Sequence, residues 1–221
     1  MFNTQPASGI LRYLLQTYQP RAIIVTGSYA DGTCNAASDF DCWLIGRDSK
    51  RVRHDTSIVN GVELQAEIYP YAYFKGMPLH TLKYFSHAVI AYDPEGLAKK
   101  FLDQAQPRLH SFPALSAAQK EQAISYLEKL LHRAASQDAH GDLRGHLLLY
   151  QSLEYWCDLT DRVFLGAKKT LRLMEKVDAE SAKIYHTALH SFTFEAMQAW
   201  CRQLRKVYES GANRQYRIFE K

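Results

Sequence analysis

The chain has 221 residues, of which 47% are hydrophobic and 23% are charged. This composition is ordinary for a soluble globular protein of one large or two small domains, with a core that needs no disulfide staples. The net charge of +4 is mildly basic and compatible with an anionic ligand such as a nucleotide. No apolar run reaches the roughly 18 residues of a membrane span, so no membrane association is expected.

Two further features of the sequence indicate a cytoplasmic protein. The four cysteines, at positions 34, 42, 157 and 201, are too widely spaced for a metal clip, so we expect reduced thiols in the core. The first residues lack the basic segment and the cleavage-like site of a signal peptide.

The first half of the chain alternates between helical and strand patterns. Ser8 is expected to cap a helix that Pro20 ends. Asn60-Gly61 predicts a hairpin turn. Strands are expected over residues 21–27, 39–46, 62–71 and 87–93, a hairpin partner over 56–59, and a helix over 72–87.

After about residue 113 only helical spacing remains. Ser116 is expected to cap the first of these helices. The helical segments are 116–136, 141–165, 169–177 and 179–208. The predicted fold is therefore α+β: a mixed β-sheet with flanking helices over residues 1–112, followed by an all-α bundle over residues 113–221.

Two carboxylates stand at the start of the second predicted strand. Asp39 and Asp41 project to one face, about 6.5–7 Å apart at the backbone, while Phe40 and Cys42 point to the other. Carboxylates this close repel each other unless a cation lies between them, and Mg²⁺ prefers oxygen ligands of this kind. The pair therefore predicts a magnesium site, with two ions about 3.5–4 Å apart as used in nucleotidyl displacement.

Gly27-Ser28, at the end of the first predicted strand, offers a phosphate site. Glycine lets the backbone approach a phosphate closely, and the serine hydroxyl and the following N–H groups donate to its oxygens. A two-metal site needs a third carboxylate, and Glu63 and Glu67 share a face of the third strand. We prefer Glu67, because the hairpin turn is expected to hold Glu63 away, and we keep Glu63 as the alternative.

The segment over residues 27–45, GSYADGTCNAASDFDCWLI, resembles the signature of the nucleotidyltransferase superfamily that contains DNA polymerase β. That signature is Gly-Ser, a spacer of ten residues here, and Asp-x-Asp between apolar residues. The resemblance implies that Gly27 and Ser28 hold a triphosphate and that Asp39 and Asp41 bind Mg²⁺. It makes Glu67 the third carboxylate, although the family often has aspartate there.

The layout resembles small bacterial aminoglycoside-type nucleotidyltransferases, in which a helical domain follows the catalytic one. Residues 88–101 resemble the end of their catalytic domain, and residues 164–176 resemble their late lysine-bearing segment, in which Lys168, or its neighbour Lys169, would contact phosphate. Glu154, Asp158 and Asp161 are spaced as one acidic stripe on a helix, suited to a polycationic acceptor.

The expected activity is Mg²⁺-dependent transfer of a nucleoside monophosphate, AMP from ATP, to an acceptor hydroxyl with release of pyrophosphate. A small molecule such as an aminoglycoside is the favoured acceptor. The alternatives are an enzyme of toxin–antitoxin type that acts on a protein or tRNA, and a nucleotide-binding or antitoxin module without turnover. The sequence leaves the oligomeric state open.

Overall fold

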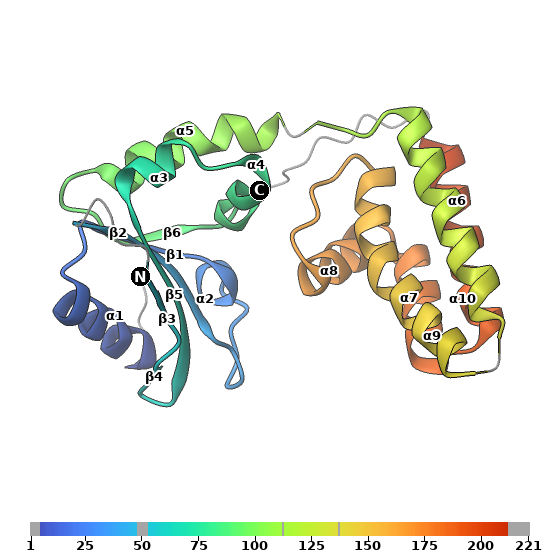
Figure 1. Cartoon of the computed structure of the whole chain (residues 1–221), viewed down its shortest axis with the longest axis horizontal. Coiled ribbons are helices and arrows are strands. Elements are labelled where there is room, and N and C mark those ends of the chain that lie inside the picture. Colours follow the sequence, from blue (N-terminus) through green and yellow to red (C-terminus); the bar gives the residue numbers. More distant parts are fainter. Residues whose placement is uncertain (1–4, 48–52, 112, 137, 212–221) are drawn as a thin grey trace. The chain divides into compact units, whose positions relative to one another are not determined.

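The computed structural model describes residues 5–47, 53–111, 113–136 and 138–211 (Figure 1). The chain divides into two compact units, Met1–Ser111 and Phe112–Lys221. Residue 112, where the sequence places the domain boundary, lies outside the described residues. Each unit is described by itself below.

The first unit is built around one mixed β-sheet with the strand order β3-β5-β2-β1-β6, in which β4 also pairs with β5. The central pair, β2 and β5, is parallel, and the other pairs are antiparallel. The elements in chain order are α1 (Gln5–Tyr18), β1 (Ala22–Val25), α2 (Gly27–Asp31), β2 (Phe40–Gly46), β3 (Arg53–Asp55), β4 (Ile58–Val59), β5 (Val62–Pro70), α3 (Tyr71–Lys75), α4 (Leu79–Leu82), the 3₁₀ helix η1 (Lys83–Phe85), β6 (Val89–Tyr92) and α5 (Leu97–His110).

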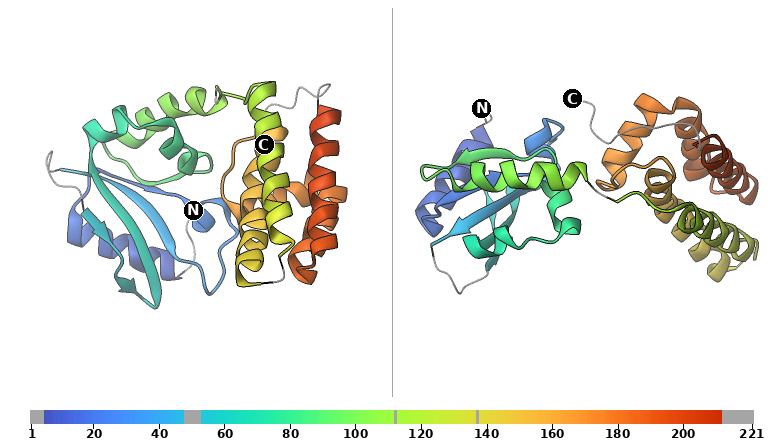
Figure 2. Two further views of the ribbon diagram at one scale, coloured as in Figure 1. Left: turned by 45° about the vertical axis from the view of Figure 1, so that its right-hand side comes forward. Right: turned by 90° about the horizontal axis from the view of Figure 1, so that it is seen from above.

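Two hydrophobic layers cover the sheet. On one face, α1 packs against the even-numbered side chains of β2 and β5, such as Phe40, Cys42 and Leu64. On the other face, Trp43 of β2 packs edge-on against Phe74 of α3 and at a tilt against Phe85 of η1. Figures 1 and 2 show α1 on one side of the sheet and α3 and α5 on the other. Successive side chains of β2 therefore pack into different hydrophobic layers on the two faces of the sheet.

Most of the expected elements of the first unit are present, with three differences. The expected helix over 72–87 is broken into α3, α4 and η1, because Gly76 ends α3 and Pro78 precedes α4. The first helix begins at Gln5, so Ser8 lies inside it and is not its cap. Strand β3 was not expected. The hairpin is confirmed: Asn60 and Gly61 have φ of 53° and 80°, as a type I′ turn requires.

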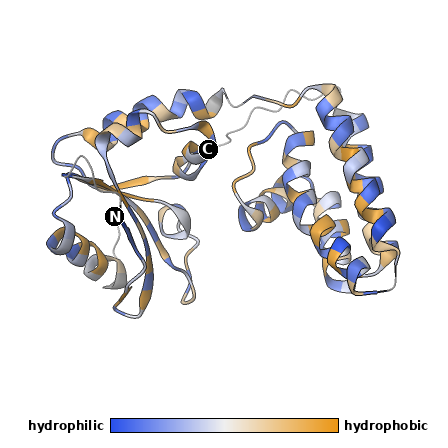
Figure 3. Cartoon of the chain, in the orientation of Figure 1, coloured by the Kyte–Doolittle hydropathy of each residue, from blue (hydrophilic) through white to orange (hydrophobic). Residues whose placement is uncertain are grey.

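The second unit consists of five helices among its described residues. They are α6 (Ala117–Ala134), α7 (Ala139–Leu159), α8 (Ala167–Val177), α9 (Ala179–Ser191) and α10 (Phe194–Gly211). Ser116 caps α6 as expected, in a capping box with Gln119. Trp156 and Trp200 are central to the core, and the Trp200 indole donates to Ser152 Oγ at 2.8 Å. Hydrophilic and hydrophobic positions alternate along these helices (Figure 3).

Two expectations for the second unit are wrong in detail. The segment over 179–208 is two helices, because Phe192 adopts a left-handed φ of 48° and ends α9. Helix α7 ends at Leu159, so Asp161 follows the helix and does not extend an acidic stripe along it. Among the described residues, no helix has both the length and the apolar run that crossing a bilayer needs.

Candidate nucleotidyl-transfer site

The end of β1, the start of β2 and the start of β5 meet at one end of the sheet. Strands β1 and β2 are antiparallel, with Val25 opposite Cys42. The amide of Thr26 donates to the carbonyl oxygen of Asp41 at 3.0 Å. The turn into α2 therefore lies directly beside the first residues of β2, and the Gly-Ser and Asp-x-Asp segments meet in space.

Gly27 lies against the Asp41 carboxylate. An added Cβ at Gly27 would stand 2.0 Å from Asp41 Oδ2, far inside van der Waals contact. The backbone of Gly27 also has a φ of 64°, which side-chain-bearing residues rarely adopt. Glycine is thus required twice here, for conformation and for space. Gly27 is the first residue of the short helix α2 and Ser28 is the second, as expected for a strand that turns into a helical segment.

The two aspartates straddle a core residue. Asp39 is exposed just before β2, and Asp41 is partly buried within it. Phe40 and Cys42 are fully buried, so the alternation along this segment is as the sequence indicates. Burial raises the pKa of the Cys42 thiol far above its ordinary value, and the nearby Asp41, Asp55 and Glu67 carboxylates add to the effect. Cys42 is therefore a neutral core residue.

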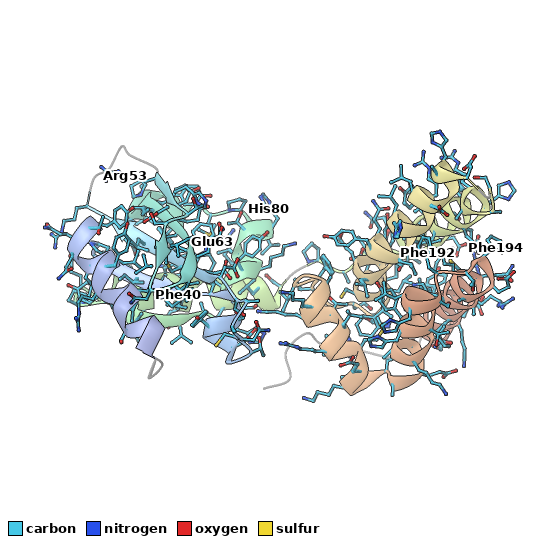
Figure 4. The ribbon with its side chains drawn as sticks, turned by 90° about the horizontal axis from the view of Figure 1, so that it is seen from below. Phe40, Arg53, Glu63, His80, Phe192 and Phe194 are labelled. Carbon is cyan, nitrogen blue, oxygen red and sulfur yellow. The ribbon has the colours of Figure 1, made fainter. Side chains whose placement is uncertain are left out.

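The parallel pairing of β2 with β5 decides which glutamate approaches the aspartates. Phe40 lies opposite Leu64 and Asp41 lies opposite Gln65. Glu63 precedes Leu64, so the backbone places it beside Asp39 at the starting end of both strands. The Gln65 side chain donates to Glu63 Oε1 at 3.2 Å. Figure 4 labels Phe40 on β2 and Glu63 on β5.

Glu67 lies alongside β2, as expected, but its carboxylate has a partner that the sequence did not indicate. Its backbone lies opposite Trp43, two residues further along β2 than Asp41. Its carboxylate pairs with His54 Nδ1 at 2.9 Å, and His54 belongs to β3 on the other edge of β5. The hairpin does hold Glu63, opposite Ile58, but on that same other edge. The hairpin therefore holds Glu63 on the β4 side, as expected, and leaves its β2 side open.

The donor chemistry of this end of the sheet fits Mg²⁺. Asp39, Asp41 and Glu63 offer hard carboxylate oxygens, which magnesium prefers. The space beside Gly27, which a Cβ would fill, holds the Asp41 carboxylate. Within the described part of the chain, no three His, Cys, Asp or Glu side chains already converge as a metal cluster. Binding of an ion would therefore require these carboxylates to draw together.

The remaining predicted site residues lie in the second unit. Lys168 is exposed at the second position of α8. Glu154 and Asp158 are one turn apart on α7, whereas Asp161 pairs with Lys120 at 2.5 Å. Burial, followed by the Glu154 carboxylate, raises the pKa of Asp158 to about 6. The expected three-residue acidic stripe is thus reduced to two carboxylates.

Gln65 and His54 are polar neighbours that the sequence analysis missed. Gln65 shares the odd-numbered face of β5 with both glutamates, a signal visible in the alternation itself. His54 lies in β3, whose three residues show no strand pattern, so its contact with Glu67 had no signal in the sequence.

The chain has limited similarity to known proteins and solved structures. No curated protein sequence matches the chain. Among solved structures, a nucleotidyltransferase-like protein from Exiguobacterium sibiricum 255-15 is 14% identical, with a TM-score of 0.41 over 93% of this chain and 74% of that one. A toxin-antitoxin structure with AMP-PNP is 13% identical, with a TM-score of 0.34 over 55% of this chain and 97% of that one.

The family comparison covers the part of the chain that contains the site. Residues 7–86 match the model of the nucleotidyltransferase domain. The match spans β1, α2, β2 and β5, and therefore includes the Gly-Ser turn, both aspartates and both candidate glutamates. The first unit of this chain contains a nucleotidyltransferase domain.

Proposed function

We propose that this protein transfers a nucleoside monophosphate, AMP from ATP, to an acceptor hydroxyl in a Mg²⁺-dependent reaction. The observation that carries the proposal is the contact between Gly27 and the Asp41 carboxylate at the end of the sheet where Asp39 and Glu63 also lie. A site for a metal-bound triphosphate needs a glycine that lets the backbone approach phosphate and carboxylates that hold the metal, and Gly27 and Asp41 bring the two together here.

Each residue has a distinct part in this reaction. Asp39 and Asp41 would hold the metal, with Glu63 as the third carboxylate, and bound Mg²⁺ supplies Lewis-acid neutralisation of phosphate charge and a lower pKa for the acceptor hydroxyl. The Ser28 hydroxyl and the first amides of α2 donate to phosphate oxygens. The acceptor oxygen forms a bond to the α-phosphorus while its O–H bond breaks and the proton passes to solvent water. The bond from the α-phosphorus to the oxygen that bridges to the β-phosphate breaks, and pyrophosphate leaves.

The choice of Glu63 over Glu67 follows from the strand register. Glu63 is at the same end of the sheet as the aspartates, and Gln65, opposite Asp41, holds it by a hydrogen bond. Glu67 already has a partner in His54 on the far side of β5. The contact between Glu67 and His54 thus has a structural role, because it links the side chains of β3 and β5.

The test is transfer of label from α-labelled NTPs. The purified protein is incubated with Mg²⁺ and one of three acceptor pools: small hydroxylated compounds including aminoglycosides, total tRNA, or cell protein. We expect labelling of the small-molecule pool; labelling of tRNA or protein alone would reassign the acceptor. No labelled product in any pool would refute transferase activity.

Paired variants test the residues. Glu63→Gln should lower turnover by about a hundredfold or more, since metal coordination contributes several kcal/mol to transition-state stabilisation. Glu67→Gln, which changes the same functional group on the same face, should remain within a few-fold of the wild type. The reverse ranking would return the third-carboxylate role to Glu67. Equal turnover of Asp41→Asn and the wild type would exclude this site altogether.

A further inference from the structure

The chain enters β6 at the same end of the sheet as the candidate site. Val89, the first residue of β6, pairs with Val25, the last residue of β1. His87 and Gly27 each lie two residues beyond this pair, and neighbouring strands lie about 4.8 Å apart. On its other side, Gly27 lies against the Asp41 carboxylate. At this end of the sheet, Gly27 therefore comes between the segment that carries His87 and the segment that carries Asp41. Figures 1 and 2 show α2 and α4 toward the same end of the sheet.

A short helical segment with nitrogen donors on its outer side leads to β6. His80 of α4, Lys83 of η1 and His87 of the following turn are spaced i, i+3 and i+7, so they lie on one side of the segment. Phe85 is fully buried on the opposite side. Residues 71–92 include no aspartate or glutamate. No carboxylate of this segment therefore offsets the positive charge of its lysine, and each of the three side chains can donate a hydrogen bond to an anion.

The two sides of the Gly27-Ser28 turn differ in charge. On the side of β2 and β5 lie the three carboxylates of the proposed metal site, and on the side of β6 lie Lys83 and His87. Away from a bound metal, carboxylates repel a chain of phosphates, whereas lysine and imidazole N–H groups attract it. A triphosphate whose α-phosphate is held at the metal is therefore expected to extend its β- and γ-phosphates across the turn toward β6.

We propose that Lys83 and His87 bind the β- and γ-phosphates and stabilise the pyrophosphate as it leaves, an inference that rests on the proposed function. When the bond between the α-phosphorus and the bridging oxygen breaks, negative charge develops on the departing pyrophosphate. Hydrogen bonds from the Lys83 ammonium and the His87 imidazole strengthen as this charge grows, so they lower the barrier to transfer. Their role is electrostatic, and neither residue exchanges a proton in this step.

The test is calorimetric titration of the full-length protein, in Mg²⁺, with ATP, pyrophosphate and AMP. Lys83→Ala and His87→Ala should each weaken binding of ATP and of pyrophosphate about tenfold or more, the effect of losing a hydrogen bond to a charged group. Binding of AMP, which lacks these phosphates, should stay within about twofold of the wild type. Lys83→Arg keeps the charge and should bind ATP within a few-fold of the wild type. As the matched control, Lys100→Ala removes an exposed lysine of α5, beyond the other end of β6, and should bind all three ligands normally.

Transfer of label, measured on the same preparations, separates this inference from the proposed function. The expected binding pattern without any labelled product would refute the transfer reaction and leave Lys83 and His87 as part of a triphosphate site. Labelled product together with unchanged pyrophosphate binding in both alanine variants would overturn the inference alone. A wild type that does not bind pyrophosphate, an equal loss of AMP binding, or Lys83→Arg as weak as Lys83→Ala would also overturn it.

Discussion

Replacing Gly27 by alanine should separate the stability of the fold from the function of the site. Gly27 has a φ of 64°, and a Cβ there would lie 2.0 Å from Asp41 Oδ2 and 3.1 Å from Asp41 Cβ. Gly32, five residues later, has a φ of 76°, and a Cβ there would meet nothing within 4 Å. The two glycines thus form a matched pair, with similar backbone conformation but different surroundings.

The structure allows the two costs to be weighed. Left-handed backbone costs a non-glycine residue about 1–2 kcal/mol, so both Gly27→Ala and Gly32→Ala should lower the free energy of unfolding by that amount. The contact with Oδ2 is relieved when the Asp41 carboxylate rotates, which adds about 0.5–1.5 kcal/mol if the new position is off-rotamer. Gly32→Ala should therefore lose about 1–2 kcal/mol of stability, and Gly27→Ala should lose up to about 1.5 kcal/mol more. Only Gly27→Ala moves the carboxylate.

Urea denaturation and nucleotide transfer, measured on the same preparations, test this reasoning. We expect Gly32→Ala to retain transfer within a few-fold of the wild type. Gly27→Ala should lose about a hundredfold or more, the effect of disturbing a catalytic metal ligand. Near-wild-type transfer by both variants would refute the argument that the Gly27 contact sets the position of Asp41. An equal loss of transfer in both variants would assign the effect to the conformation of α2.

Two further predictions concern stability against pH. Burial acts to raise the pKa of Asp55, but hydrogen bonds from Ser57, Tyr18 and Tyr13 hold that pKa below its ordinary value. The stabilisation that these hydrogen bonds give the fold is therefore present at neutral pH and is lost as the pH falls through the pKa of Asp55 in the folded state. Tyr18→Phe should therefore cost about 1.5–3 kcal/mol at pH 7 in urea denaturation, and less at pH 3; a pH-independent loss would contradict this account. The pKa of Asp158 is raised from 3.8 to about 6, so its ionisation destabilises the fold as the pH rises through that interval. Asp158→Asn should raise the free energy of unfolding by about 1–3 kcal/mol at pH 8 and have little effect at pH 4, and no gain at pH 8 would refute it.

The local features of the site could be predicted from the sequence because they are set within a few residues. The alternation of Asp39 and Asp41 with Phe40 and Cys42 is a property of one strand, and the Asn60-Gly61 turn is a property of two residues. The Ser116 capping box of α6 is equally local. In each case the energetic preference is carried by adjacent side chains and backbone, and tertiary packing did not override it.

The third carboxylate depends on pairing between strands that are distant in the chain. A hairpin is a local signal, and it suggested that Glu63 was occupied by β4. The parallel partnership of β2 and β5 has no such signal, because two other strands, β3 and β4, intervene in the sequence. Likewise, nothing in the sequence near His54 indicates that it would meet Glu67. Register between distant strands is set by burial across the whole sheet.

The same alternation that holds the core presents the site. Phe40 and Cys42 are both fully buried against α1, and fully burying a large apolar side chain stabilises a fold by about 1.5–3 kcal/mol. A slip of one residue in β2 would turn Phe40 away from this core and bury the Asp41 carboxylate in its place. Such a slip would be costly, because burying an unpaired charge is unfavourable. The register is therefore fixed by side chains that take no part in the chemistry. The same register places Asp39 and Asp41 at the end of the sheet beside the Gly27-Ser28 turn, where the proposed metal and nucleotide would bind.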